Sequence, residues 1–298
     1  MDCGLYGSDW RLILAGSPWN FINPCALLLL RGAAAITHFA MLIWARFYQD
    51  MLYFTTWTNL MALLTFWLWT AGSIAALCSL SRQRRQAEAA CGSDACGSSA
   101  TRCSFFSFFR GAHAQYRQLL KEQTELSCSY SASKAPPLRR WFDFRRPFSG
   151  SPRRRGLEAF LCLHDIAVSL ALPMNIIMFL VYWIMLLPKA SKSEMATTVY
   201  LHLCCPVATW VLAILSRVPY RLSLFPLTIL LGVIYEVMIA IVQSFGFGFV
   251  YWFMNFQENP GLACGVSAGL ILVLNPATAC LAFLVLFYNN AAVVAVED

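Results

Sequence analysis

Charged side chains are scarce in this chain of 298 residues. Only 12% of its residues are Asp, Glu, Lys or Arg, whereas 59% are hydrophobic and the mean hydropathy is +0.58. A soluble domain has roughly 45–50% apolar and about 25% charged residues. One soluble core could not hold this much apolar surface. The composition therefore excludes an ordinary soluble domain and predicts several membrane-spanning segments of about 20 residues each.

Two further absences exclude other classes of protein. The N-terminal stretch MDCGLYGSDW has no basic region followed by a cleavable apolar segment, so we expect no signal peptide and an uncleaved first span. None of the 12 cysteines forms a C-x-x-C pair. Cys91, Cys96 and Cys103 would need a fourth ligand to hold zinc, and His113 is the nearest histidine. We therefore expect no metal site and no other cofactor.

Six apolar stretches are long enough to cross a bilayer. They comprise residues 24–46, 51–80, 158–187, 195–215, 223–252 and 266–288. The sequence therefore predicts an all-α membrane protein, a bundle of six transmembrane helices. Residues 1–80 would carry the N-terminal tail with spans one and two. Residues 158–298 would carry spans three to six and a short C-terminal tail.

The segment between spans two and three, residues 81–157, has a different composition. It holds 15 of the 22 Lys and Arg residues but only five acidic residues, which gives a net charge of +10. Basic residues that flank a span are retained in the cytosol. We therefore expect a cytosolic insert with both termini on the same side, although Lys189 and Lys192 would then lie outside. The pattern fits the plasma membrane and the endoplasmic reticulum equally well.

Membrane lipids are the expected partners of this chain. The insert is rich in Ser, Cys and Arg, a composition typical of disordered segments. Its basic residues between 82 and 155 could also contact anionic lipid, at about 1 kcal/mol per residue near the surface. Because the insert is held at a membrane, we do not expect it to bind nucleic acid. The sequence gives no indication of the oligomeric state.

Polar side chains inside a span are costly unless they face the bundle interior and have partners. The expected orientation places three such groups in one layer of the outer leaflet: His38, the stretch YFTTWTN at 53–59, and His202. With a helical rise of 1.5 Å per residue, Thr55 lies about 6 Å, His202 about 10 Å and His38 about 12 Å below the outer span ends. A hydroxyl and two imidazoles therefore share one depth.

A hydroxyl and an imidazole at one depth are the minimum for nucleophilic catalysis, because a histidine can take the proton of a threonine hydroxyl. Another interpretation stays open. Threonines in membrane helices commonly bond to a carbonyl one turn earlier or to a neighbouring helix. Thr55 and Asn59 are four residues apart, so their shared helix face could equally be a helix–helix contact.

Glu236 is expected near the middle of the membrane. It either orients His38 or His202, or it forms a structural ion pair with Arg31. Together with His38 and Asn59, we expect Glu236 to line a substrate pocket. A polar path through His38, Glu236 and His202 would instead suit a small transporter, for which helices broken at mid-membrane are typical.

The order of these features resembles the rolling stone family of multi-pass proteins. The motifs are YFTTWT at the start of span two, VYW near the end of span three, a histidine early in span four, and LFPLTILLGVIYEVMIAIVQSFG followed by VYWFMNFQENPG. That family was first linked to myoblast fusion and is distantly related to the androgen-induced family of membrane hydrolases. The resemblance covers the spans and omits the insert.

The resemblance implies a function as well as a fold. In the androgen-induced relatives, a threonine in a Tyr-Leu-Thr stretch of span two is the nucleophile, and a histidine of span four is its partner. These relatives hydrolyse fatty acid esters of hydroxy fatty acids. By resemblance, Thr55 is the nucleophile and His202 the base, whereas alignment on Asn59 would select Thr56. The relatives tend to carry Asn shortly after the histidine, where this chain has residues 204–206, Cys-Cys-Pro. The rolling stone branch itself implies a non-enzymatic, fusion-associated alternative.

Overall fold

The structure is a computed structural model that describes residues 10–17, 22–45, 53–90, 116, 152–187, 198–216, 218, 220–246, 248 and 251–296. These residues form helices and no strand, which confirms the prediction of an all-α protein. The helices are α1 (Trp10–Ala15), α2 (Pro24–Trp44), α3 (Phe54–Ala90), α5 (Pro152–Val181), α7 (Cys205–Ile214), α8 (Phe225–Ser244), α9 (Pro260–Gly269) and α10 (Asn275–Val296). Three short π-helical turns adjoin them: η4 (Tyr182–Leu186), η7 (Tyr200–Cys204) and η10 (Leu270–Leu274). Two 3₁₀ turns, η8 (Leu222–Leu224) and η9 (Trp252–Met254), complete the order.

Five of the six expected spans appear as helices that are long and apolar enough to cross a membrane. These helices cover Pro24–Trp44, Phe54–Gln83, Ala159–Leu186, Leu222–Ser244 and Pro260–Asn289. The expected fourth span is shorter: η7 and α7 together cover Tyr200–Ile214, and residues 188–197 before them lie outside the described residues. The chain is therefore a multi-pass membrane protein with five such helices in its described part.

The structure moves several predicted boundaries. The fifth span ends at Ser244 rather than at 252, because the chain turns at Gly246. The φ angle of Gly246 is +84°, in the left-handed region that only glycine adopts without strain. Helical structure extends into the predicted insert from both sides, since α3 continues to Ala90 and α5 begins at Pro152. Apart from Tyr116, residues 91–151 lie outside the described residues. The predicted disorder of the insert concerns these residues and therefore stays a prediction.

Local sequence explains where α2 begins and which face it buries. The side chain of Asn23 accepts a hydrogen bond from Cys25 N at 2.8 Å, and Pro24 occupies the first turn, where no N–H is needed. The buried residues of α2 repeat every three or four positions: Leu27, Arg31, Ala35, His38 and Leu42. This spacing places them on one helix face. That face packs on α3, and the opposite face is exposed.

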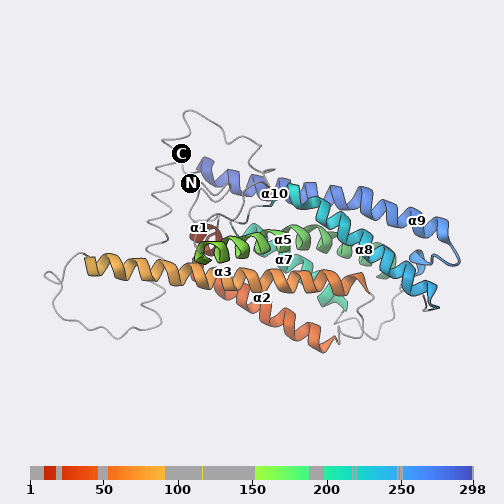
Figure 1. Ribbon diagram of the computed structural model, residues 1–298, viewed down its shortest axis with the longest axis horizontal. Coiled ribbons are helices and arrows are strands. Elements are labelled where there is room, and N and C mark those ends of the chain that lie inside the picture. Colours follow the sequence, from red (N-terminus) through yellow and green to blue (C-terminus); the bar gives the residue numbers. More distant parts are fainter. Residues whose placement is uncertain are drawn as a thin grey trace.

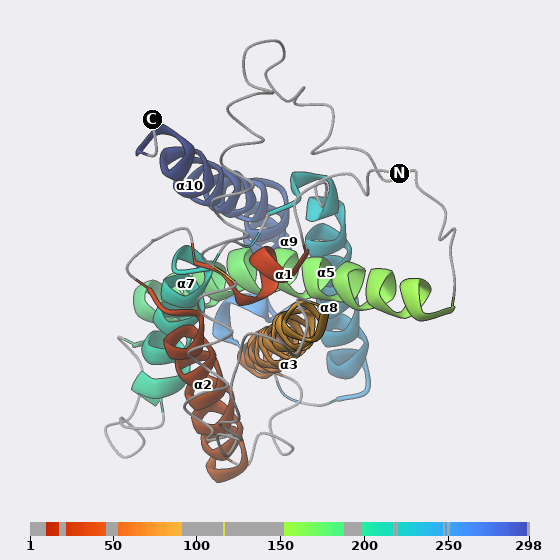
Figure 2. The same cartoon turned by 90° about the vertical axis from the view of Figure 1, so that its left-hand side faces the viewer.

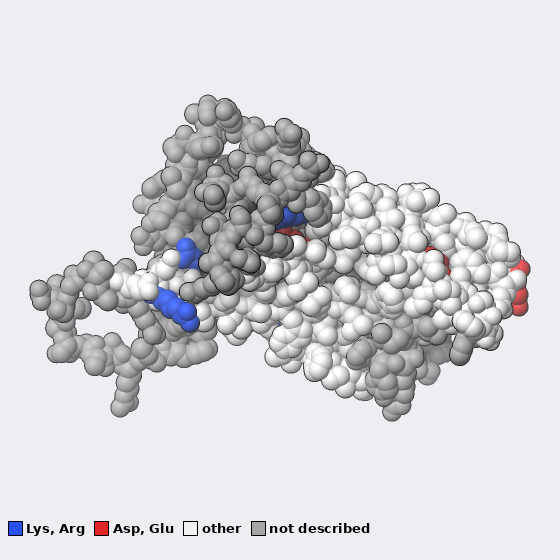
Figure 3. Space-filling view, in the orientation of Figure 1, with Lys and Arg blue, Asp and Glu red and all other residues white. Residues whose placement is uncertain are grey.

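Helix α3 lies at the centre of the bundle. Figures 1 and 2 show α3 running along its long axis, with α2, α5 and α7 around it. Its contact face combines Phe66 and Trp69 with small residues such as Ala62 and Ala76, all nearly inaccessible. Small residues let membrane helices approach closely. On the face drawn in Figure 3, most of the surface between the two ends of the bundle carries no charged side chain, as a membrane-embedded surface requires.

Proline 173 interrupts α5 without ending it. Proline has no N–H to donate to the carbonyl four residues earlier, which here belongs to Ser169. The hydroxyl of Tyr220 donates to that carbonyl at 3.5 Å instead. Tyr220 is almost fully buried. The aromatic hydroxyl therefore compensates the missing backbone donor and ties the segment before α8 to α5.

Buried ionic groups stabilise one end of the bundle, the end that lies away from the N-terminus of α3. The guanidinium of Arg31 donates to Leu14 O and Ser73 Oγ and, at 2.7 Å, to Ser216 Oγ. It therefore joins α1, α3 and the end of α7. Asp165 pairs with Arg221 at 2.7 Å. The alternative in which Arg31 pairs with Glu236 is wrong, because the hydrogen bond of Glu236 goes to Ser267.

Candidate functional site

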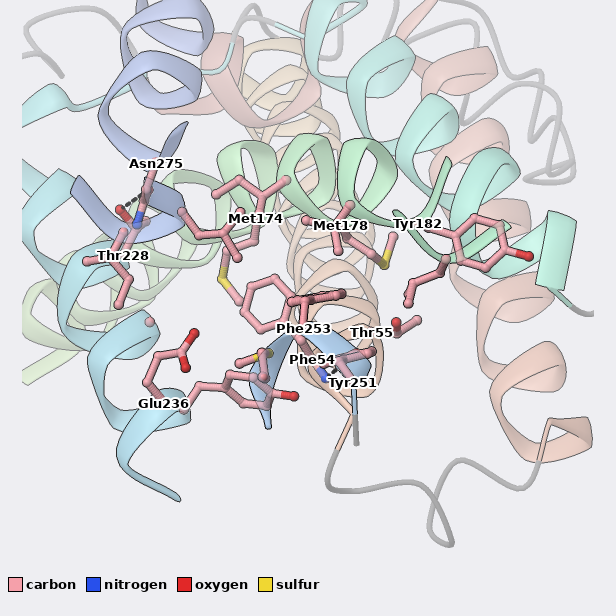
Figure 4. A pocket seen from close by; sticks show the side chains of 18 of the residues that line it. Phe54, Thr55, Met174, Met178, Tyr182, Thr228, Glu236, Tyr251, Phe253 and Asn275 are labelled. Carbon is pink, nitrogen blue, oxygen red and sulfur yellow. Dashed lines mark hydrogen bonds between the residues drawn. The ribbon is translucent and has the colours of Figure 1, made fainter. Parts of the chain in front are cut away.

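An apolar cavity lies near the N-terminus of α3, enclosed by α3, α5, η4, η7, α8, η9, η10 and the start of α10 (Figure 4). It holds about 680 Å³ of empty space, part of which is continuous with the surroundings. Most of the lining side chains are aliphatic or aromatic. The residues that bring hydroxyl, imidazole, amide or carboxyl groups to its lining are Thr55, Tyr182, His202, Thr228, Tyr235, Glu236, Tyr251 and Asn275. An apolar cavity with few polar groups is typical of a small-molecule site.

All three π turns of the described residues contribute to this cavity. Tyr182 and Leu186 come from η4, His202 from η7, and Leu270 and Ile271 from η10. A π turn costs regular hydrogen-bond geometry, and such turns occur frequently at functional sites. Three of them around one cavity mark it as the part of the bundle where the helices depart from regular packing.

A proline follows each π turn at a fixed distance in the sequence, and for η7 and η10 this proline lies among the described residues. Pro188, Pro206 and Pro276 each stand two residues after the last residue of a π turn. The residue before the proline donates its backbone N–H five residues back, as Cys205 does to Tyr200. In a regular helix the proline ring would clash with the carbonyl four residues earlier, and the wider turn relieves that clash. The prolines therefore set the local shape of the cavity wall.

His202 lies on the turn that Pro206 widens. Its ring stacks on Tyr182, with centroids 3.8 Å apart and planes 13° from parallel. Its backbone carbonyl accepts a hydrogen bond from Trp183 Nε1 at 3.4 Å, replacing the donor that Pro206 lacks. Among the described residues, Nδ1 of His202 has no hydrogen-bond partner. The imidazole is therefore held in orientation by stacking, and its buried Nδ1 makes no hydrogen bond among the described residues.

Thr55 lines the cavity and Thr56 does not, although the two are neighbours. The Thr55 carbonyl accepts hydrogen bonds from Thr58 Oγ1 at 2.9 Å and from Asn59 Nδ2 at 2.8 Å. Its hydroxyl hydrogen bonds to the phenolic oxygen of Tyr251. Thr56 is buried away from the cavity. Thr58 and Asn59 therefore make the helix-stabilising bonds expected of such residues in a membrane, and the Thr55 hydroxyl faces the empty space.

His38 and Asn59 lie outside the lining of this cavity, so of the three expected pocket residues only Glu236 reaches it. Nε2 of His38 is 2.9 Å from Asn59 O and 3.5 Å from Cys205 Sγ. The His38 ring also meets the edge of Phe66, with centroids 5.7 Å apart. His38 therefore joins α2 to α3 and α7 behind the cavity wall.

Tyr251 is a cavity residue that sequence reasoning missed as a candidate. Its hydroxyl oxygen accepts a hydrogen bond from Phe54 N at 3.1 Å, at the first turn of α3. Burial raises the pKa of Tyr251 to about 12, although hydrogen bonds from Thr55, Phe54 N and Tyr235 to its oxygen act in the opposite direction. The phenol therefore keeps its proton at neutral pH. The sequence assigned Tyr251 to the end of a span, which hid its position in a returning loop.

The loop that carries Tyr251 is fixed to the end of α8 by Gln243. The side chain of Gln243 donates to Met254 O at 2.7 Å and accepts from Phe256 N at 3.0 Å. The backbone carbonyl of Gln243 accepts from Gln257 Nε2 at 2.5 Å. Phe253 stacks on Tyr251 with planes 4° from parallel. These bonds position the aromatic wall of the cavity above the first turn of α3.

Glu236 lies at the other side of the cavity from Thr55 and Tyr182 (Figure 4). Its Oε2 accepts a hydrogen bond from Ser267 Oγ at 2.8 Å, which links α8 to α9. A second polar pair lies nearby, where Thr228 Oγ1 donates to Asn275 Oδ1 at 2.9 Å. The cavity thus has a hydroxyl and an imidazole on one side and a carboxyl group on the other.

No group of three or more His, Cys, Asp or Glu side chains within the described ranges is placed to hold a metal ion. The cysteines considered above, Cys91, Cys96 and Cys103, lie outside those ranges with His113.

Comparison of the chain with protein-family models, curated proteins and solved structures gave no match. The resemblance to the rolling stone family therefore stays a prediction from sequence motifs, and function has to be argued from the cavity.

Proposed function

We propose that this multi-pass membrane protein hydrolyses long-chain acyl esters inside the membrane, with Thr55 as nucleophile and His202 as base. The observation that carries the proposal is that both residues line one apolar cavity, at which all three described π turns meet. The apolar lining suits a hydrocarbon chain, whose burial is favourable by about 0.8 kcal/mol per CH₂ group. The resemblance to threonine hydrolases selects the same two residues from different evidence.

The first half of the reaction forms an acyl-enzyme. Thr55 Oγ attacks the carbonyl carbon of the ester, and His202 accepts the proton of the hydroxyl. The carbonyl oxygen takes up the electron pair of the broken π bond. Tyr251 is a neutral phenol that already contacts Thr55, so it donates a hydrogen bond to this oxyanion. The carbonyl then re-forms, and the alcohol leaves with the proton that His202 returns.

The second half regenerates the enzyme. A water molecule attacks the acyl-threonine carbonyl while His202 accepts one of its protons. The same hydrogen bond from Tyr251 supports the second oxyanion. Collapse releases the carboxylic acid, and the proton on His202 goes back to Thr55 Oγ. In the free protein the Thr55 hydroxyl bonds to Tyr251 rather than to His202, so the proposal requires the bond to His202 to form with the substrate, as catalytic hydrogen bonds often do.

Thr55→Ala and Thr56→Ala form the matched pair that tests the proposal. Both remove one hydroxyl and one methyl group from adjacent positions of α3, but only Thr55 lines the cavity. Hydrolysis of p-nitrophenyl esters of graded chain length by purified protein should disappear with Thr55→Ala and His202→Ala and persist with Thr56→Ala. Equal activity of Thr55→Ala and wild type would contradict the proposal. A wild type without esterase activity would favour the non-enzymatic, fusion-associated alternative.

The finer topology belongs to the same proposal. We infer six spans, in which η7 and α7 belong to a fourth span whose first part lies among residues 188–197. Both termini and the insert face the cytosol, because basic residues flank α3 and α5 at one end. The insert contacts anionic lipid there. Membership of the rolling stone family is part of this proposal, and so is a place for the cavity in the outer leaflet.

A further inference from the structure

Glu236 has more hydrogen-bonding capacity than its contacts use. A carboxylate offers about four acceptor positions, and Ser267 Oγ occupies one of them. Glu236 is half-buried on a membrane-spanning helix, and Figure 4 shows its carboxyl group directed into the cavity. It is the only Asp, Glu, Lys or Arg among the described cavity residues. An acidic group at this depth is costly.

A structural bond between α8 and α9 does not account for this choice of residue. A serine or threonine opposite Ser267 would link the two helices at a lower desolvation cost than a carboxyl group. Thr228 and Asn275 already form such a neutral pair at the same cavity. The carboxyl group at position 236 therefore indicates a donor that is absent from the protein itself and arrives with the ligand.

The surroundings favour a neutral donor over a cation. An ammonium group would have to leave water and enter an otherwise apolar cavity, at a cost of several kcal/mol even beside a carboxylate. A hydroxyl group costs less to bury and can donate to a free acceptor position of Glu236 while Ser267 Oγ keeps its own bond to Oε2. Glu236 and Thr55 lie at different sides of the cavity (Figure 4), so one ligand can reach both only through an intervening hydrocarbon segment.

We propose that Glu236 and Ser267 form a binding subsite for a free hydroxyl group on the hydrocarbon chain of the ligand. The substrate class is then a long-chain acyl ester that carries a hydroxyl remote from the ester bond. The ester part of this statement rests on the proposed function. The hydroxyl subsite does not, since binding needs neither Thr55 nor His202.

Binding to the full-length Thr55→Ala protein tests the subsite without turnover. The ligands are octadecyl methyl ethers, which contain no ester, with a single hydroxyl placed at successive chain positions, and the unsubstituted ether as reference. Competition with a fluorescent fatty-chain probe gives each Kd. One hydrogen bond to the Glu236 carboxyl group predicts about tenfold tighter binding of the best-placed hydroxyl isomer than of the reference. No preference at any position overturns the subsite.

Substitutions at position 236 assign the preference to its residue. Glu236→Leu and, as a second apolar variant of similar length, Glu236→Met should bind the unsubstituted ether at least as tightly as Thr55→Ala alone, because an apolar side chain replaces the carboxyl group, and should lose the tenfold preference. Thr228→Val, which alters the other polar pair, should keep it. Preference that survives both apolar variants overturns the subsite. Tighter binding of amino ethers than of hydroxy ethers would show that the subsite prefers a cation to a hydroxyl group, and would also overturn the proposal.

The two proposals fail in distinguishable ways. A hydroxyl preference that depends on Glu236, in a wild-type protein that hydrolyses no ester, leaves the subsite and removes the hydrolase. Hydrolysis of plain and hydroxylated esters with the same kcat/KM, in wild type and in Glu236→Leu alike, leaves the hydrolase and removes the subsite.

Discussion

At the scale of single residues, adjacent or similar side chains have separate roles that residue type does not reveal. Thr55 faces the cavity, whereas its neighbour Thr56 is buried elsewhere. Both candidate histidines were predicted to share one depth, but only His202 lines the cavity. Depth along a helix follows from residue number, which is why the sequence could place these residues in one layer. The direction in which each side chain points depends on local helix geometry, which the π turn changes around His202.

Alanine variants of His38 and His202 should differ in both stability and activity. His202→Ala removes the proposed base and its stacking on Tyr182 but no side-chain hydrogen bond among the described residues, so activity should vanish with a smaller loss of stability than in His38→Ala. His38→Ala leaves a buried contact with Asn59 O unmade, which predicts a loss of about 1–3 kcal/mol of stability with hydrolysis retained. Thermal unfolding in detergent and ester hydrolysis of both variants check this. Inactive His38→Ala with wild-type stability would contradict the assignment.

Tyr251→Phe should lower kcat by about 10²–10³-fold and change KM little, since the hydroxyl acts on the oxyanion and not on the bound ester. Because the pKa of Tyr251 is about 12, the donor stays protonated below that pH, and its own titration should cause no loss of kcat between pH 6 and 10. A kcat profile over that range measures this. Tyr53→Phe is a suitable control, because Tyr53 lies beside the Tyr251 ring without lining the cavity. Equal kcat values for Tyr251→Phe and wild type would remove Tyr251 from the mechanism.

At the scale of elements, proline placement decides the form of the site. Prolines inside apolar stretches were visible in the sequence as interruptions of spans, and a kink could be expected from them. The sequence did not predict that a π turn would precede each of Pro188, Pro206 and Pro276. A proline can also kink a helix or, like Pro173, leave it α-helical. Tyr251 was missed for a related reason. The apolar run continues past Ser244, but the turn at Gly246 ends the helix earlier.

Pro206→Ala should restore a donor for the carbonyl of His202 and favour a regular α-helical turn. An α-helical turn contains one residue fewer than a π turn. Conversion of the π turn to an α turn would therefore rotate the preceding side chains by about 100° about the helix axis. His202 should then leave the cavity, so hydrolysis should fall at least tenfold while Tm stays unchanged or rises. Pro226→Ala is the matched control, because Pro226 stands exposed in the first turn of α8 with no π turn before it. Full activity of Pro206→Ala would show that the π turn does not position the base.

At the scale of the whole molecule, the sequence predicted an all-α multi-pass bundle because apolar length and composition determine membrane crossing. Five of the six spans could be recognised in this way. Contacts between residues that are distant in the sequence could not be predicted from it. Arg31 donates hydrogen bonds to Leu14, Ser73 and Ser216, which come from three distant parts of the chain. The predicted pairing of Arg31 with Glu236 was therefore wrong. Tyr116, inside a segment expected to be disordered, is buried near Leu77 and Leu80.

The orientation of the bundle can be measured directly. A glycosylation acceptor inserted between residues 120 and 135 should stay unmodified, because basic flanks keep the insert in the cytosol. An acceptor in a spacer inserted within 188–197 should be modified and serves as the positive control. Endoglycosidase sensitivity on gels reads out both. Modification of the first acceptor but not the second would invert the orientation and move the cavity to the cytosolic leaflet.

Covalent labelling tests the central claim, that Thr55 is a nucleophile in an acyl-ester cavity. The purified protein is treated with a long-chain fluorophosphonate, which reacts with an activated hydroxyl, and the modified peptide is located by mass spectrometry. The account predicts one phosphonylated residue, Thr55, with labelling lost in Thr55→Ala and His202→Ala and kept in Thr56→Ala. Absence of label in an intact, monodisperse wild-type protein, or label on any residue other than Thr55, would contradict it.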